Sequence, residues 1–212
     1  DVAPEGSILR LGVPAKINPG VQTFCQLAAT PRHSIGEINE TYMGCQIVAT
    51  TCMGTNHALF QRRAFDVCIV DEASQITLPT SLGPLLHARK FVLVGDHFQL
   101  PPLVQNRAAL EGGLDISLFK QLSERFPEAV ATLGRQYRMC EDIMSLSNEL
   151  IYSGQLKCGT ESVANRTLKL TNDSGLELFH RQQQGCDASG PSCWLSHLTN
   201  PQNKVVFANI DP

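Results

Sequence analysis

Two neighbouring carboxylates, Asp71 and Glu72, stand directly after the apolar run 65–70. Adjacent carboxylates repel each other unless a proton or a cation is shared between them. A Mg²⁺ ion on Asp71 would remove this repulsion and could bridge the oxygens of a bound phosphate. Glu72, one residue on, points elsewhere and could hold and polarise an attacking water molecule. The alternative for this pair is a helix N-terminus, where the helix dipole stabilises acidic side chains.

A second polar group follows another apolar run. Gly95 relieves the backbone at a tight strand exit, and Asp96 can accept hydrogen bonds from neighbouring backbone amides. Gln99 carries both a donor and an acceptor, so it can contact a phosphate oxygen and an attacking water together. Pro101 and Pro102 stiffen the end of this loop. The alternative is an ordinary strand, turn and helix interrupted by a Pro-Pro break.

The run Gln-Tyr-Arg-Met at 136–139 forms a third group. Arg138 stands between a predicted strand and a predicted helix, where it could act as an arginine finger that stabilises the charge of a phosphoryl-transfer transition state. Tyr137 could stack on a nucleobase. The alternative for Arg138 is a surface ion pair with Glu141 or Asp142, which is common and contributes little.

Alternating strands and helices are needed to bring these groups together. Continuous apolar runs predict parallel strands that are buried on both faces, and the segments between them predict crossover helices of an α/β domain. Because ligands bind outside the carboxyl ends of such strands, the first two polar groups should share one edge of the sheet. The predicted strands are 8–11, 46–49, 65–70 and 91–94, and the predicted helices are 19–29 and 79–88.

Beyond residue 116 the pattern changes. Apolar stripes predict helices at 117–122 and 141–152, the second of which ends just before Gly154. Short apolar runs predict strands at 129–133 and 204–208, while the polar segment 181–203 is typical of a long loop or insertion.

Composition and charge narrow the class of protein. The chain has 212 residues, of which 42% are hydrophobic and 17% are charged, as in globular proteins. Its formal net charge of −3 gives no electrostatic support for nucleic-acid binding, although backbone amides and a few well-placed groups could still bind a strand. No apolar run approaches the roughly 18 residues that span a bilayer, so we expect no membrane contact.

The eight cysteines form no Cys-x-x-Cys pair, so the sequence offers no zinc or iron–sulfur spacing, and free thiols suit a reducing compartment. A metal-dependent hydrolase built on Asp71, Glu72 and Asp96 is disfavoured, because the chain has no histidine ligands at metal-binding spacing.

The order and spacing of the three groups closely resemble motifs II, III and IV of the superfamily 1B helicases. An apolar strand that ends in Asp-Glu is also the Walker B pattern. The runs 10–12 and 48–54 look like the motif Ib and Ic regions, and the stretches 47–56, 68–75 and 144–150 look most like the eukaryotic helicase/nucleases of DNA replication. The resemblance covers about residues 8–170. Phe98 and Cys140 depart from the more usual residues of these motifs, at positions that tolerate variation.

This resemblance implies a RecA-like P-loop NTPase helicase core, in which ATP lies between two domains. Residues 1–133 would be the C-terminal part of the first domain, and residues 134–212 the N-terminal part of the second. Asp71 would hold Mg²⁺, Glu72 would activate water and Gln99 would sense the γ-phosphate. Gln136 and Tyr137 would bind the nucleotide, Tyr137 by stacking on adenine, and Arg138 would reach the γ-phosphate.

The resemblance also implies single-stranded DNA as the partner, with movement from 5′ to 3′. The implied contacts to the strand are Arg10, Thr50, Thr51, Pro101 and Pro102. A nuclease domain with a 4Fe–4S cluster would lie outside this chain. The implied location is the nucleus, with the mitochondrion as a second compartment and a single-strand-binding protein as a plausible partner.

A phosphate-binding loop, Gly-x-x-x-x-Gly-Lys-Ser/Thr, is missing from the chain. Gly154 and Gly159 have the spacing, but Thr160 and Glu161 follow where the loop requires Lys and Ser or Thr. The later motifs V and VI are missing as well, and the chain begins on Asp1. We therefore expect the central fragment of a helicase motor that cannot hydrolyse ATP alone. An RNA or RNA–DNA helicase of the same superfamily and a truncated, non-catalytic binding module remain the alternatives.

Overall fold

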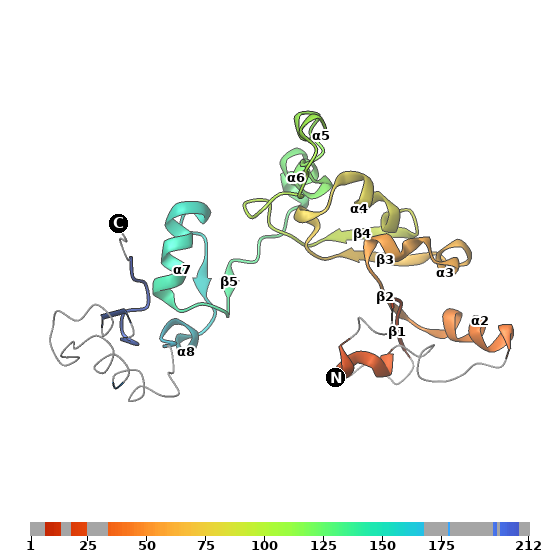
Figure 1. The fold of residues 1–212 in the computed structure, drawn as a ribbon, viewed down its shortest axis with the longest axis horizontal. Coiled ribbons are helices and arrows are strands. Elements are labelled where there is room, and N and C mark those ends of the chain that lie inside the picture. The colour runs from red at the N-terminus through yellow and green to blue at the C-terminus, as the bar shows by residue number, and fades with distance from the viewer. Residues whose placement is uncertain are drawn as a thin grey trace. The chain divides into compact units, whose positions relative to one another are not determined.

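The computed structural model describes residues 7–13, 18–24, 34–167, 178, 197–198 and 200–207. It divides into two compact units, Asp1–Val130 and Ala131–Pro212, so the division falls three residues before the boundary predicted from the sequence (Figure 1). The polar segment 181–203 lies almost entirely outside the described residues.

In the first unit, a small parallel sheet anchors the core. Strand β1 (Ile8–Arg10) pairs with β2 (Ile47–Ala49) in parallel register. Helices α2 (Ile35–Gly44) and α3 (Ala58–Arg62) flank β2 in the chain. Ser34 caps the N-terminus of α2, because its hydroxyl accepts a hydrogen bond from Glu37 N at 3.2 Å. The buried core residues are Leu9, Leu11, Cys45, Leu59 and Phe60.

A second parallel pair of strands carries the acidic group. Strand β3 (Phe65–Val70) pairs with β4 (Ala88–Leu93), and α4 (Leu78–Leu85) connects them (Figure 1). The parallel α/β pattern is confirmed. The helix predicted at 79–88 extends three residues beyond the end of α4 and includes Ala88, the first residue of β4. The charged Arg89 and Lys90 hide the start of that strand from an apolar pattern.

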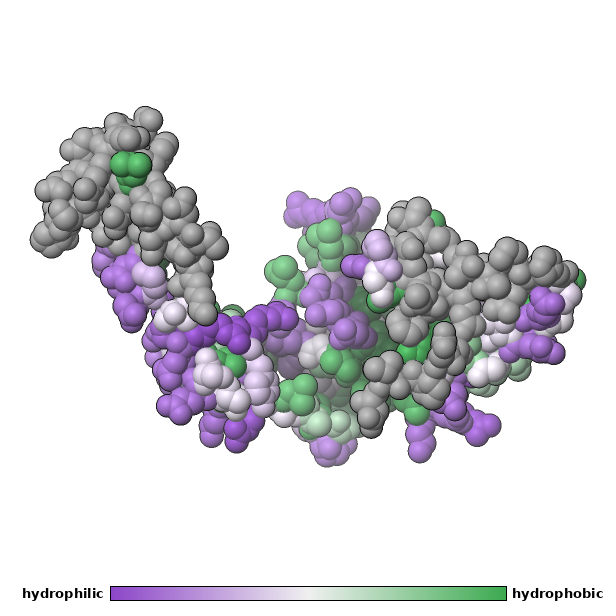
Figure 2. All heavy atoms as spheres, turned by 90° about the horizontal axis from the view of Figure 1, so that it is seen from below, coloured by the Kyte–Doolittle hydropathy of each residue, from purple (hydrophilic) through white to green (hydrophobic). Residues whose placement is uncertain are grey.

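The expected burial of these strands on both faces is wrong. The sheet formed by β3 and β4 has two strands among the described residues, so side chains that a wider sheet would cover remain exposed. Apolar (green) surface is visible in the right-hand part of Figure 2. The exposed strand residues include Val67 (49%), Ile69 (69%), Phe91 (50%) and Val92 (48%).

Short helical turns complete the first unit. The helix predicted at 19–29 is a 3-10 turn over Pro19–Phe24, and residues 25–29 lie outside the described part. Two further 3-10 turns, Cys52–Asn56 and Ala73–Gln75, follow β2 and β3.

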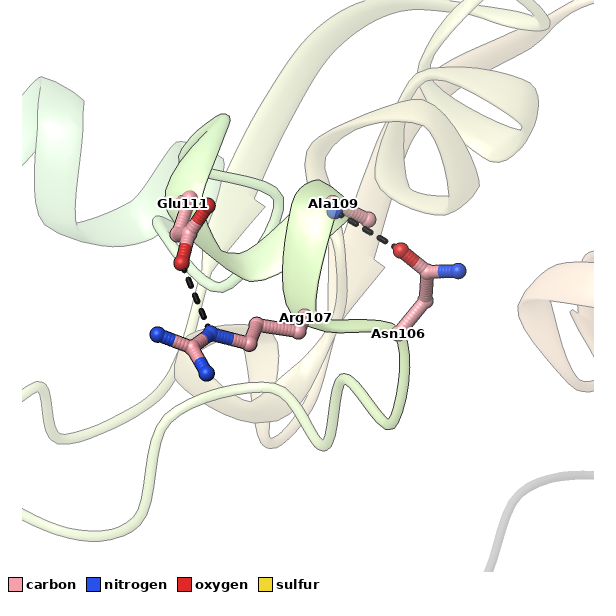
Figure 3. Close-up of polar contacts among 4 residues, drawn as sticks. All are labelled: Asn106, Arg107, Ala109 and Glu111. Carbon is pink, nitrogen blue, oxygen red and sulfur yellow. Dashed lines mark hydrogen bonds and ion pairs between the residues drawn. The ribbon is translucent and has the colours of Figure 1, made fainter.

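Two capped helices follow β4. In α5 (Arg107–Glu111), the Asn106 side chain accepts a hydrogen bond from Ala109 N at 3.0 Å, and Arg107 Nε lies 2.9 Å from Glu111 Oε1 (Figure 3). The helix predicted at 117–122 is confirmed as α6 (Leu118–Arg125), capped by the buried Ser117 hydroxyl.

The second unit is built on another parallel pair, β5 (Arg135–Gln136) and β6 (Lys157–Cys158). The helix predicted at 141–152 is α7 (Glu141–Ser147), which continues as a π-helical turn over Asn148–Tyr152. Gly154 follows with φ +78°, as expected for a residue just past a helix end. Of the predicted apolar stripe, Met144 is buried while Ile143, Leu146, Leu150 and Ile151 are exposed. Helix α8 (Glu161–Ala164) follows β6.

The strand predicted at 129–133 is wrong. The structure has a 3-10 turn, Pro127–Ala129, followed by residues without regular structure. Val130 and Leu133 are exposed by 46% and 83%. A β-branched apolar run becomes a strand only when a neighbouring strand supplies hydrogen-bond partners, and none of the described strands does so here. Residues 204–207 likewise form no strand.

Candidate functional site

The acidic pair forms the turn at the end of β3. Asp71 Oδ1 accepts a hydrogen bond from Glu72 N at 3.0 Å, and Glu72 Oε2 accepts one from Gln75 Nε2 at 3.0 Å. Both carboxylates are exposed. Glu72 has φ +51° and ψ +35°, a left-handed conformation that costs a residue with a Cβ about 1–3 kcal/mol. The fold therefore holds Glu72 in a defined and unfavourable backbone position.

The alternative interpretation of this pair, a helix N-terminus, is partly met. Glu72 occupies the N-cap position of the 3-10 turn Ala73–Gln75. Its side chain makes no capping hydrogen bond, and the turn has only three residues. The carboxylates are thus not explained as caps.

Backbone hydrogen bonds join the ends of β3 and β4. Val94 N donates to Val70 O at 2.8 Å, and Ala73 N donates to Val94 O at 2.8 Å. The buried Ser74 hydroxyl accepts a hydrogen bond from Asp96 N at 3.1 Å. The loop after β4 is therefore attached directly to the acidic turn, and the expectation that these two polar groups share one sheet edge is confirmed. Ser74 was not singled out from the sequence, although it belongs to the run Asp-Glu-Ala-Ser-Gln.

Gly95 leaves room for this attachment. A Cβ atom on Gly95 would lie 2.9 Å from Ser74 N and 3.3 Å from Ala73 N. The residue does not have a positive φ. The sequence predicted a glycine that relieves a tight strand exit, and the structure shows that the requirement is close approach of two backbones.

The carboxylate of Asp96 organises the rest of the loop. Its Oδ1 accepts a hydrogen bond from Phe98 N at 3.0 Å, and its Oδ2 accepts one from Gln99 Nε2 at 2.9 Å. The side chain of Gln99 is thereby fixed above the loop. Pro101 is exposed and Pro102 is buried, so the loop is fastened at its far end.

Three of the residues expected to contact a nucleic-acid strand, Arg10, Thr50 and Thr51, lie at the ends of β1 and β2. Arg10 is the register partner of Ala49, so its backbone ends beside Thr50. An added Cβ on Gly54 would overlap the Thr50 hydroxyl, and Gly54 N donates to Thr51 O at 2.8 Å. The 3-10 turn after β2 therefore packs directly against the Thr-Thr pair, a contact that the sequence did not predict.

In the second unit, the Gln136 amide organises the Gln-Tyr-Arg-Met turn. Its Oε1 accepts hydrogen bonds from Arg138 N and Met139 N, both at 2.8 Å. Its Nε2 donates to Met139 O at 2.9 Å and to Cys158 Sγ at 3.2 Å. The sequence assigned Gln136 to nucleotide binding, whereas these contacts give it an internal, turn-forming role as well.

Tyr137 and Arg138 project from this turn. Tyr137 is 59% exposed, and its ring lies against Gly159. Arg138 is exposed and takes part in no ion pair among the described residues. The surface ion pair considered as its alternative is thus not formed. Arg166 Nη1 donates to the Arg138 carbonyl at 3.2 Å and steadies the backbone at this point.

One acidic residue next to this turn, Asp142, forms an ion pair with a lysine. Asp142 Oδ2 lies 3.0 Å from Lys204 Nζ. The hydrogen bond with Asp142 is the main cause that raises the pKa of Lys204 above its ordinary value. This pair connects α7 with the described segment near the end of the chain.

The acidic turn fits one Mg²⁺ ion shared with a phosphate. Magnesium is usually held by one or two carboxylates, by phosphate oxygens and by water, and Asp71 offers an exposed carboxylate of which one oxygen carries a single internal hydrogen bond. Among the described residues, no group of three His, Cys, Asp or Glu side chains could hold a metal without such a ligand. Nor does the described part of the chain contain a helix long and apolar enough to cross a membrane.

Comparison with known proteins gives consistent matches. Two families, each described as an AAA domain, match residues 26–107 and residues 114–212. The DNA replication ATP-dependent helicase/nuclease dna2 of Schizosaccharomyces pombe is 48% identical over 207 residues, which cover 98% of this chain and 14% of that protein. The mouse (Mus musculus) protein DNA2 of the same description is 50% identical over 208 residues, or 96% of this chain and 19% of the relative.

The DNA2 helicase/nuclease of Saccharomyces cerevisiae is 44% identical over 210 residues, or 97% of this chain and 13% of the relative. The chain thus spans only about a fifth or less of the length of the curated relatives that it matches.

Proposed function

Because this chain belongs to the superfamily 1B helicases of the DNA replication helicase/nuclease type, we propose that it is the central segment of an ATP-dependent motor that moves along single-stranded DNA. The observation that carries this proposal is the junction of β3 and β4. There, backbone hydrogen bonds fix the acidic turn of Asp71 and Glu72 to the loop of Gln99. A hydrolytic site needs such a fixed arrangement of a metal ligand, a base and a phosphate sensor.

Each residue of this edge has one proposed task. Asp71 holds Mg²⁺, which when bound neutralises charge on the β- and γ-phosphates of ATP. Glu72 accepts a proton from the attacking water, and its fixed left-handed backbone aims the carboxylate. Gln99, held by Asp96, contacts the γ-phosphate, and a shift of Gln99 on binding or loss of this phosphate moves the stiff Pro101-Pro102 loop.

The second unit is proposed to complete the site. Residues 1–133 and 134–212 are, in this proposal, parts of two RecA-like domains with ATP between them. Tyr137 stacks on the adenine ring, and Gln136 shapes the turn that presents it. Arg138, which has no ion-pair partner among the described residues, is available to stabilise the transition-state charge on the γ-phosphate.

The DNA strand is proposed to run past the ends of β1 and β2. Hydroxyls of Thr50 and Thr51 and the side chain of Arg10 contact its phosphates, and Pro101 and Pro102 lie near it. Movement from 5′ to 3′ follows the superfamily to which the chain belongs. The formal net charge of −3 gives this segment no general attraction to phosphates, so the proposed contacts are local ones.

We also propose a cellular location, a partner and a second activity for the whole protein. Because the matched relatives are named for DNA replication, we place the whole protein in the nucleus, with the mitochondrion as a second compartment and a single-strand-binding protein as partner. A nuclease activity with a 4Fe–4S cluster is assigned to parts outside these 212 residues. These residues contain no phosphate-binding loop, and we propose that they hydrolyse no ATP alone.

The substitution Glu72→Gln in the full-length protein tests this proposal. It keeps the size of the side chain but removes the base, so ATP binding should persist while kcat of the DNA-stimulated ATPase falls by about 10²–10⁴-fold. Glu111→Gln is the matched control, since Glu111 is exposed and, among the residues that the structure describes, forms an ion pair with Arg107 alone. Normal turnover in Glu72→Gln would remove Glu72 from catalysis, and stimulation by RNA but not by DNA would reassign the substrate.

A further inference from the structure

Position 159 holds a glycine because a larger side chain would not fit beside Tyr137. Its backbone does not have a positive φ, so an L-amino acid could adopt the same conformation. A Cβ atom built on it would nevertheless overlap the Cδ1, Cε1 and Cζ atoms of the Tyr137 ring. The bare Cα of Gly159 is therefore a surface on which one side of this ring rests.

The sheet of the second unit fixes this contact. Gln136 and Cys158 are register partners in β5 and β6, and Gly159 N donates to Gln136 O at 2.8 Å. Tyr137 thus follows β5 where Gly159 follows β6, side by side. The residue after Gly159 is also held, because the Thr160 hydroxyl accepts a hydrogen bond from Val163 N at 3.3 Å.

The backbone on the tyrosine side is equally constrained. The Gln136 amide accepts hydrogen bonds from the next two backbone N–H groups after Tyr137, and Arg166 binds the Arg138 carbonyl. Between two fixed backbones, the freedom of the ring lies in its own side-chain torsions. One side of the ring lies against Gly159, and Tyr137 as a whole remains 59% exposed.

We propose that Gly159 is a positioning residue for nucleotide binding: its missing side chain seats Tyr137 so that the ring presents a flat outward surface to the base of ATP. This inference rests on the proposed function, in which Tyr137 stacks on adenine. Gly159 touches neither the base nor the phosphates in this scheme, and it acts only through Tyr137.

The consequence of a methyl group at this position follows directly. In Gly159→Ala the flexible ring yields before the hydrogen-bonded backbones do, so the fold is kept and the ring swings away. Contacts to the triphosphate are made elsewhere and remain. Stacking on the base is lost in both the ground state and the transition state, so KM for ATP rises while kcat stays close to that of the wild type.

We would measure steady-state DNA-stimulated ATPase in the full-length protein. Gly159→Ala should raise KM for ATP roughly 5- to 100-fold, the range of base–aromatic stacking. Gly134→Ala is the matched control, because its Cβ would lie 3.4 Å from Gln155 O, an ordinary contact, in the same part of the unit. Thermal unfolding midpoints of both variants verify that they fold.

Variants of Tyr137 distinguish the stacking role of Tyr137 from the positioning role of Gly159. Tyr137→Phe keeps the ring and should behave as the wild type, whereas Tyr137→Ala should raise KM as Gly159→Ala does. In the double variant, Gly159→Ala should add nothing to Tyr137→Ala. A normal KM in Tyr137→Ala would overturn the stacking role itself. A raised KM in Tyr137→Ala with a normal one in Gly159→Ala, or additive effects, would overturn the role of Gly159 alone.

Discussion

At Arg138 a hydrogen bond restrains the backbone, whereas the charged side chain forms no ion pair among the described residues. Its carbonyl accepts a hydrogen bond from Arg166, and its guanidinium enters no ion pair among the residues that the structure describes. A surface arginine with nearby acids would normally pair with them, yet Asp142 pairs with Lys204 instead. This arrangement leaves the charge available for a ligand.

Arg138→Ala should therefore lower kcat of the full-length protein by about 10³–10⁵-fold, the usual contribution of an arginine finger. The DNA-stimulated ATPase assay measures this directly. Arg107→Ala removes an exposed arginine that pairs with Glu111 one helical turn away, and it should leave kcat unchanged. A loss of less than about tenfold in Arg138→Ala would make Arg138 an ordinary surface residue.

Residue types and spacing single out Asp71, Glu72 and Gln99 as candidates, because their chemistry is visible one residue at a time, and their roles stay predictions. The supporting contacts were not predictable in this way. The bond from Asp96 N to Ser74 and the seat of Tyr137 on Gly159 join segments that are 22 residues apart in both cases. Such pairs are set by strand register, which a single sequence does not reveal.

At the scale of elements, parallel pairing of β3 with β4 could be predicted from their apolar runs. Boundaries and isolated short runs were predicted less well. The predicted helix 79–88 includes Ala88, the first residue of β4, and Arg89 and Lys90 were assigned to no element, while the run 129–133 has no strand partner among the described residues. In both cases tertiary context overrides the local pattern.

The N-cap of α6 provides a test at this scale. The Ser117 hydroxyl accepts a hydrogen bond from Lys120 N at 3.1 Å, and Ser117 is 2% exposed. Ser117→Ala removes this capping hydrogen bond from the Lys120 N–H and replaces a buried hydroxyl by a methyl group. We expect the free energy of unfolding to fall by about 1–2 kcal/mol in urea denaturation.

Ser123→Ala is the matched control for α6, because the exposed Ser123 hydroxyl only donates to Lys120 O within the same helix. It should change the free energy of unfolding by less than about 0.5 kcal/mol. Equal effects of the two substitutions would show that the cap does not hold α6.

At the scale of the whole chain, several side chains have raised pKa values and so lose their protons only at a higher pH than usual. Burial is the main cause that raises the pKa of the Cys45, Cys52 and Cys68 thiols above their ordinary value of 9.0 and that of Tyr42 above 10.0. The folded state therefore holds these protons more tightly than the unfolded state. The resulting stability is fully present below the ordinary pKa values and is lost as pH rises through the folded ones.

We expect the urea midpoint to be level near neutral pH and to fall above about pH 9. Circular dichroism at a series of pH values would measure it. Cys68→Ala should make the fall shallower, because one of the contributing thiols is gone. A midpoint that stays constant to about pH 10.5 would show that these thiols ionise as easily in the folded state as in the unfolded one.

The exposed strands β3 and β4 have a practical meaning for anyone who handles this chain in isolation. Val67, Ile69 and Val92 on one face of the sheet, and Phe91 on the other, form exposed apolar surfaces. Among the described residues this sheet has two strands, so its outer edges have no strand partner there. Such surfaces capture one another as concentration rises, and they also capture chaperones and dyes. We therefore expect the yield and solubility of the isolated segment to depend on these exposed apolar side chains.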